Sequence, residues 1–177
     1  MNVRRFFAIV IALLCSLPVG AVAQATFDPE ARLRELTLEL PTPTTPVANY
    51  VRAVRTGNLV FLAGHGECGP GKYFGKIPRD RTIEEGYDAA RNVGLCLLAS
   101  LKAEIGDLRK VKRIVRVFGM VNATEDFTQQ PKVINGCSDL LVAVFGDRGR
   151  HARAAVGMQA LPNNISVEIE MVVEVAD

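Results

Sequence analysis

The chain has 177 residues, of which 49% are hydrophobic and 23% charged, and its formal net charge is +2. This length is typical of one domain with a sizeable core, and the composition indicates a globular protein rather than a disordered or fibrous one. The small net charge argues against the basic surface with which nucleic-acid binders displace counterions from phosphates.

The first 23 residues are predicted to be a signal peptide. A basic stretch, MNVRR, precedes an apolar run, FFAIVIALLCSLPVG, and small residues that suit cleavage after Ala23 or Ala25. A membrane anchor is the alternative, but it needs about 20 apolar residues, and this run is shorter and is interrupted by Pro18. We therefore expect export to the periplasm or secretion, with no membrane contact after cleavage. Loss of Arg4 and Arg5 from the 21 basic residues leaves 19, which balance the 19 acidic ones.

Residues 24–46 are predicted to be an N-terminal arm and linker that is peripheral to a domain at 47–177. Within the arm, DPEARLRELTLEL has the pattern of a short helix, with Asp28 as its N-cap and Pro29 in its first turn. The following PTPTTP is typical of an extended segment.

Strand and helix patterns alternate through the rest of the chain. We expect two strands around a turn within 49–64, a loop with room for a short strand at 65–80, a helix at 82–106, a strand at 111–121, a helix at 131–146 and strands at 151–161 and 165–175. Thr82 and Glu85 form a capping-box pattern at the start of the first long helix. This order predicts an α+β fold with two helices packed on one face of a mixed β-sheet. The other face, which carries Glu168 and Glu170, is then either solvated or part of a subunit interface.

The cysteines and histidines do not form a recognisable framework. Cys68, Cys96 and Cys137 remain after signal removal, and an odd number at wide spacing is not typical of a disulfide scaffold. One pair can form in an oxidising compartment, although buried free thiols are favoured for Cys96 and Cys137 because both lie in predicted helices. Neither His65 nor His151 has a Cys or His partner at metal-ligand spacing, so no metal site is expected.

Two charged residues near the C-terminus are candidates for chemistry. Arg153 lies among alanines, where its guanidinium could hold a carboxylate through two parallel hydrogen bonds. Glu168 lies between Val167 and Ile169, where partial burial would raise its pKa and suit it to proton transfer. The alternative for both is an ordinary solvated charge on a half-buried strand.

The segment ARAAVGMQALPNNISVEIE resembles the C-terminal signature of the Rid/YjgF family, the reactive-intermediate deaminases once labelled L-PSP endoribonucleases. YVRAVRTGNLVFLAGH and VNATEDF are similar to other segments of that family, so that the resemblance covers about residues 46–176. It implies a chorismate-mutase-like fold, a homotrimer with clefts between subunits, and hydrolysis of 2-imino or enamine acids to 2-oxo acids and ammonia, without cofactor or metal.

The resemblance also implies roles for individual residues. Arg153 would hold the substrate carboxylate, Glu168 would activate water, and the backbone of Ala155 would contact the substrate nitrogen. Tyr50 and Asn122 match further positions of the cleft.

The chain departs from the family at Ala63-Gly64-His65, where S-G-Q is common, so substrate contacts are expected to differ there, with His65 among them. The expected partners are a small carboxylate-bearing substrate and further copies of the chain, with no nucleic acid. A non-catalytic trimeric binder of small carboxylates is the alternative, and the neutral charge disfavours a ribonuclease.

Overall fold

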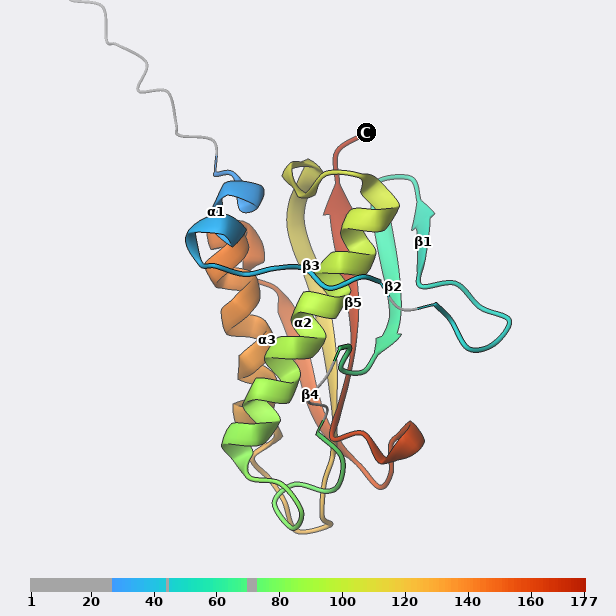
Figure 1. Cartoon of the computed structure of the whole chain (residues 1–177), viewed down its shortest axis with the longest axis vertical. Coiled ribbons are helices and arrows are strands. Elements are labelled where there is room, and N and C mark those ends of the chain that lie inside the picture. Colours follow the sequence, from blue (N-terminus) through green and yellow to red (C-terminus); the bar gives the residue numbers. More distant parts are fainter. Residues whose placement is uncertain (1–26, 44, 70–72) are drawn as a thin grey trace, which may run out of the picture.

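Five strands form one mixed sheet in the order β1-β2-β5-β3-β4 (Figure 1). Their bounds are β1 Ala53–Thr56, β2 Leu59–His65, β3 Val111–Asn122, β4 Ala152–Met158 and β5 Val167–Val175. Neighbouring strands are antiparallel except β3 and β4, which are parallel. The computed structural model describes residues 27–43, 45–69 and 73–177, so the predicted signal peptide lies outside the described residues.

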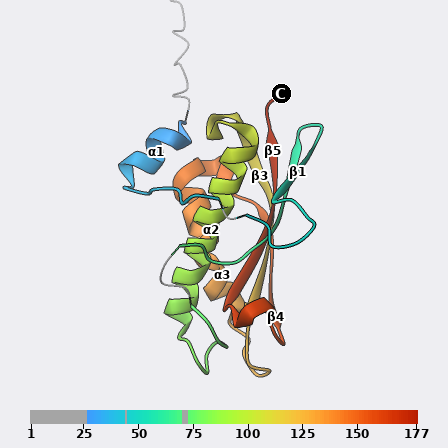
Figure 2. The same cartoon turned by 45° about the vertical axis from the view of Figure 1, so that its right-hand side comes forward.

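Two long helices cover the same face of the sheet (Figure 2). They are α2 (Ile83–Ile105) and α3 (Gln130–Phe145), and α3 connects the two parallel strands. The predicted capping box is present in α2, where the Thr82 hydroxyl accepts a bond from the Glu85 amide and the Glu85 carboxylate accepts one from the Thr82 amide. The α+β class predicted from the order of elements is therefore confirmed.

The alternation along β5 decides which side chains face the helices. Val167, Ile169, Met171, Val173 and Val175 are buried, and the residues between them point to the opposite face. We call this opposite side, which α2 and α3 do not cover, the open face. It is not uniformly polar, because Val54 on β1 is 55% exposed and Phe61 on β2 is 44% exposed.

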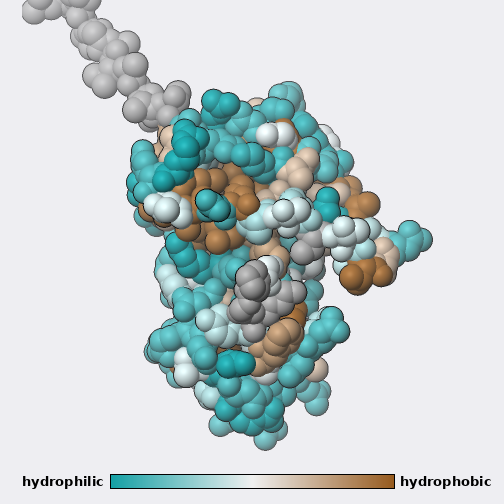
Figure 3. Space-filling view, in the orientation of Figure 1, coloured by the Kyte–Doolittle hydropathy of each residue, from teal (hydrophilic) through white to brown (hydrophobic). Residues whose placement is uncertain are grey.

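The N-terminal arm is part of the fold rather than peripheral to it. Helix α1 (Pro29–Glu35) is capped by Asp28, whose side chain accepts hydrogen bonds from the amides of the first turn. Leu33 is buried, and further leucines of the arm pack against the core: Leu36, Leu38 and Leu40. Figure 3 shows hydrophobic surface where the arm crosses the helices. The prediction of a peripheral arm was wrong because the leucines that follow α1 find apolar partners on helices distant in sequence.

A disulfide fastens the loop after β2 to α2. Cys68 is bonded to Cys96, with 6.1 Å between their Cα atoms. The expectation of a free Cys96 thiol was therefore wrong, because the loop folds back onto the helix and brings together cysteines 28 positions apart. Cys137 is a free, fully buried thiol as expected, and burial raises its pKa to about 12. The loop contains isolated bridges at Phe74 and Ile77 instead of a short strand.

Three short 3₁₀ helices lie between the longer elements of the described residues. They are η1 (Leu108–Lys110), η2 (Gly146–Gly149) and η3 (Pro162–Asn164). The strand predicted for 151–161 ends earlier, at Met158, because the chain then leaves the sheet edge on its way to η3.

Candidate functional site

Glu168 lies on the open face near the start of β5. It is half-buried and makes no hydrogen bond or ion pair within the described part of the chain. Its carboxylate lies over the backbone of Gly64, since a Cβ added to Gly64 would be 2.1 Å from Oε1 of Glu168. Burial raises the pKa of Glu168, and the charge of Glu170 on the same face raises it further. An unpaired carboxylate of raised pKa is a good proton acceptor for bound water.

Arg153 lies on β4, which is an edge strand because it pairs only with β3. Its side chain reaches α3, where Nη1 donates to Oδ1 of Asn135 at 2.9 Å and to Oγ of Ser138 at 3.0 Å. The Nε and Nη2 donors have no partner among the described residues. The guanidinium is thus held on one side and presents two N–H groups on the other, as bidentate recognition of a carboxylate requires.

Arg153 and Glu168 lie on opposite faces of the sheet. Arg153 is in register with Val117, whose other neighbour, Met171, is buried against the helices. Glu168 is in register with Met120 and belongs to the open face. Strand β3 separates the two side chains, so a small molecule cannot contact both of them within one chain.

Ala155 and Tyr50 lie near opposite edges of the sheet. Ala155 follows Arg153 by two positions on the same face of β4, opposite Gly119, and is partly buried. Tyr50 precedes β1, and its side chain is 51% exposed. Ala155 therefore accompanies Arg153, whereas Tyr50 lies at the other side of the molecule.

His65 is buried at the end of β2 and faces α2. Its Nδ1 is 2.7 Å from the carbonyl oxygen of Ala63, and its Nε2 is 2.8 Å from Oγ of Ser100. Because a carbonyl can only accept, Nδ1 carries the hydrogen and Nε2 accepts from the serine hydroxyl. Burial lowers the pKa of this histidine. The imidazole is therefore on the face of the sheet opposite to Glu168.

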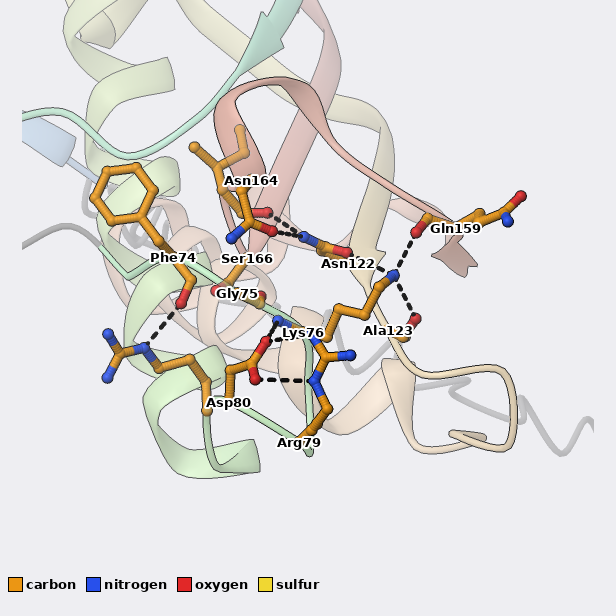
Figure 4. A network of polar contacts seen from close by, with 12 residues as sticks. Phe74, Gly75, Lys76, Arg79, Asp80, Asn122, Ala123, Gln159, Asn164 and Ser166 are labelled. Carbon is orange, nitrogen blue, oxygen red and sulfur yellow. Dashed lines mark hydrogen bonds and ion pairs between the residues drawn. The ribbon is translucent and has the colours of Figure 1, made fainter.

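Asn122 is buried at the end of β3 in a network that joins three loops (Figure 4). Its Nδ2 donates to Oδ1 of Asn164 and to the carbonyl of Ile165, both at 3.1 Å. Its Oδ1 accepts from Nζ of Lys76, which also donates to the carbonyls of Ala123 and Gln159. In this arrangement the amide ties the loops together.

Sequence reasoning did not single out the partners of Arg153. Asn135 and Ser138 are three positions apart on α3, the spacing that places two side chains on the same face of a helix. Ser138 in turn contacts His151, with 3.1 Å between Oγ and Nε2. The helical spacing was readable in the sequence, but the approach of α3 to β4 was not.

Residues 27–43, 45–69 and 73–177 contain neither a candidate metal cluster nor a candidate membrane-spanning helix. In those segments, no three or more His, Cys, Asp or Glu side chains are grouped so that they could hold a metal ion. No helix in them is long and apolar enough to cross a membrane.

Several known proteins are similar to this chain in sequence or in fold. Protein TCP17 of Trypanosoma cruzi is 39% identical over 148 residues, which cover 81% of this chain and 92% of that protein. A 2-iminobutanoate/2-iminopropanoate deaminase of Dermatophagoides farinae is 27% identical over 136 residues, covering 77% of this chain and 93% of the relative. The crystal structure of Atu1372 from Agrobacterium tumefaciens is 41% identical and superimposes with a TM-score of 0.78, covering 84% of this chain and 92% of the other.

A family model described as "YjgF/chorismate mutase-like, putative endoribonuclease" matches residues 30–175, which include all of α1 but its first residue, the five strands and both long helices. The resemblance read from the C-terminal signature is thereby confirmed, and the sheet with two helices on one face is the fold of that family. The chain belongs to the YjgF/Rid family.

Proposed function

We propose that the protein hydrolyses small 2-imino or enamine acids to 2-oxo acids and ammonia, in clefts formed between copies of the chain. The observation that carries this proposal is that one side chain is available to bind a carboxylate and another is available to act as a base. Arg153 is fixed on one side and has free donors on the other, while Glu168 is an unpaired carboxylate of raised pKa. The name of the mite relative, an iminobutanoate and iminopropanoate deaminase, supports the same substrate class.

The opposite placement of the two residues supports a site shared between copies. The edge strand β4, with Arg153, would approach the open face of a neighbouring copy, with Glu168. A contact between two different surfaces closes into a ring when the rotation allows it, and we propose a ring of three. Apolar side chains such as Phe61 and Val54 on the open face would then be covered. Light scattering on the purified protein should give three times the chain mass.

The reaction needs only water and proton transfers. Arg153 of one copy would bind the substrate carboxylate and place the C=N carbon near Glu168 of the next. Glu168 takes a proton from water as the oxygen bonds to that carbon, and passes it to the imine nitrogen, which gives a carbinolamine. The carbinolamine hydroxyl then gives its proton through Glu168 to the same nitrogen, so that the C=O bond forms as the C–N bond breaks and ammonia leaves. Orientation by Arg153 and base catalysis by Glu168 are the two contributions the protein would make.

The test is to generate 2-iminopropanoate with an amino-acid oxidase acting on alanine and to follow release of pyruvate. Glu168→Gln removes the base and Arg153→Ala removes the carboxylate contact, so each should abolish the acceleration over spontaneous hydrolysis. Positioned general bases contribute about 100- to 10,000-fold. Glu168→Gln should not lower the melting temperature, because a raised pKa means that the ionised carboxylate is disfavoured in the folded protein.

Matched control variants are available away from the site, one on β5 and one on η1. Glu174→Gln changes an acid to an amide on the same face of β5, away from the site, and Arg109→Ala removes an exposed arginine paired with Asp107. Both should keep full activity. Equal activity of Glu168→Gln and the unmodified protein would overturn the proposal.

A non-catalytic binder of small carboxylates is the second candidate. It is favoured by the surroundings of Glu168, where Ala63 and Gly64 offer no side-chain donor and His65 faces α2. A binder would hold pyruvate through Arg153 but accelerate no imine hydrolysis. For a ribonuclease, in contrast, we would expect RNA binding that weakens steeply with salt.

Export also remains our proposal. The disulfide between Cys68 and Cys96 supports it, because such bonds persist in oxidising compartments. N-terminal sequencing of the protein recovered from a secreting host should begin after Ala23 or Ala25.

A further inference from the structure

A chain of hydrogen bonds runs from the backbone through a histidine and a serine to Arg153. The Nδ1 atom of His151 is 2.7 Å from the carbonyl oxygen of Gly149, and its Nε2 is 3.1 Å from Oγ of Ser138. Oγ of Ser138 also accepts the bond from Nη1 of Arg153 at 3.0 Å. Three side chains from α3, β4 and the segment before β4 are thus linked in series.

The carbonyl at one end sets the direction of every bond in this chain. Because the Gly149 oxygen can only accept, Nδ1 of His151 carries the hydrogen, and the lone pair of Nε2 faces Ser138. The serine hydroxyl therefore donates to His151, and its oxygen lone pairs are directed at Arg153. The neutral imidazole in this way makes Ser138 an acceptor of fixed orientation for the guanidinium.

We propose that Ser138 and His151 are positioning residues that hold Arg153 for a carboxylate ligand, and that protonation of His151 strengthens the binding of that ligand. This inference rests on the proposed function only in taking Arg153 as the carboxylate contact. Oδ1 of Asn135 accepts a bond from the second hydrogen of Nη1, so the two bonds together fix the plane of the guanidinium. The fork of Nε and Nη2 remains for the ligand.

The coupling to protons follows from charge. A protonated His151 turns Nε2 into a donor, releases the serine hydroxyl hydrogen and places a second positive charge beside Arg153. A bound carboxylate offsets that repulsion, and thermodynamic reciprocity then requires that protonation favour carboxylate binding. Burial and the charge of Arg153 both hold the pKa of His151 below its usual range. The tightening is therefore expected below about pH 6.5.

Other charged groups on the elements that flank His151 are accounted for by their own contacts. They belong to α3 and to the turn before β4: Asp139, Asp147, Arg148 and Arg150. Asp139 accepts from the Tyr87 hydroxyl, Asp147 pairs with Arg150, and Arg148 donates to the Val111 carbonyl. Arg153 is the charged residue that shifts the pKa of His151, and it lowers that pKa.

Binding rather than turnover tests the inference. The dissociation constant of pyruvate is measured by calorimetry at about pH 7.5 and about pH 5, with the Glu168→Gln protein as parent. This background removes the titration of Glu168, whose raised pKa would otherwise also favour anion binding at low pH. We expect pyruvate to bind the parent about 5-fold more tightly at the lower pH.

Three variants separate positioning from mere stability. Ser138→Ala should weaken pyruvate binding about 3- to 10-fold at the higher pH, and Ser138→Thr, which keeps the hydroxyl, should restore it. His151→Gln offers an amide oxygen that can accept from Ser138 but does not titrate. It should therefore bind pyruvate like the parent at the higher pH and lose the tightening at the lower one. Melting temperatures show that each variant is folded.

The outcomes distinguish this inference from the proposed function. Unchanged binding in Ser138→Ala, or persistence of the pH effect in His151→Gln, would overturn the inference while leaving Arg153 as the carboxylate contact. Unchanged pyruvate binding in Arg153→Ala would instead overturn the role of Arg153 on which both depend.

Discussion

Replacement of Gly64 by alanine is expected to remove activity with little loss of stability. The new Cβ would lie 2.1 Å from Oε1 of Glu168, whereas ordinary contact begins at 3.4 Å. The carboxylate must therefore move by about 1.3 Å. Because Oε1 is the free end of a flexible side chain, rotation about the side-chain bonds can relieve the overlap. Displacement of a catalytic group by about 1 Å can cost about 100-fold in rate.

The assay for Gly64→Ala is pyruvate release from 2-iminopropanoate, together with a thermal melt. We expect kcat to fall about 100-fold and the melting temperature to change by less than about 3 °C. Gly57→Ala is the matched control, because Gly57 lies in a turn with φ +55° and nothing lies within 4 Å of its added Cβ. That variant should lose about 1 kcal/mol of stability through backbone strain and keep its activity. Full activity in Gly64→Ala would show that the position of the Glu168 carboxylate is not what the reaction uses.

Three other predictions concern pH, the disulfide and the contact between the helices. Activity should fall as the pH drops through the raised pKa of Glu168, which lies above the usual 4.5, and Glu170→Gln should move this fall to lower pH in a pH–rate profile. Reduction of the disulfide, or the double change of Cys68 and Cys96 to serine, should lower the free energy of unfolding by about 3–4 kcal/mol in urea titrations; an unchanged midpoint would refute a bridge in solution. Gly136→Ala would place a Cβ 1.9 Å from the carbonyl oxygen of Tyr87 on the facing helix. We therefore expect the free energy of unfolding to fall by about 3 kcal/mol in thermal melts. Near-native stability would contradict this helix packing.

The elements of secondary structure were readable from local patterns. The capping box of Thr82 and Glu85 and the glycine at 106 delimit α2, and the strict alternation along residues 165–175 identifies β5. These signals act over a few residues, where hydrogen-bond capping and burial of alternate side chains decide the backbone. The loop from residue 65 onwards was less predictable, since its course depends on the disulfide and on the Lys76 and Asn122 network.

Local sequence patterns identified only part of the candidate site. The C-terminal signature identified Arg153 and Glu168, but it did not show that they face opposite sides of the sheet or that Asn135, Ser138 and His151 accompany the arginine. Other segments that resemble the family placed His65 and Asn122 near the substrate, whereas the structure directs His65 to α2 and engages Asn122 between loops.

The sequence by itself thus determined the family, the order of helices and strands, and the two charged residues that the proposed chemistry needs. Only the tertiary structure decided which side chains become neighbours. The faces of the sheet depend on register between strands, and the partners of Arg153 depend on how α3 packs against β4. Both are set by burial of apolar surface between segments that are far apart in the chain. A local pattern of residues does not specify which distant segment will pack against it.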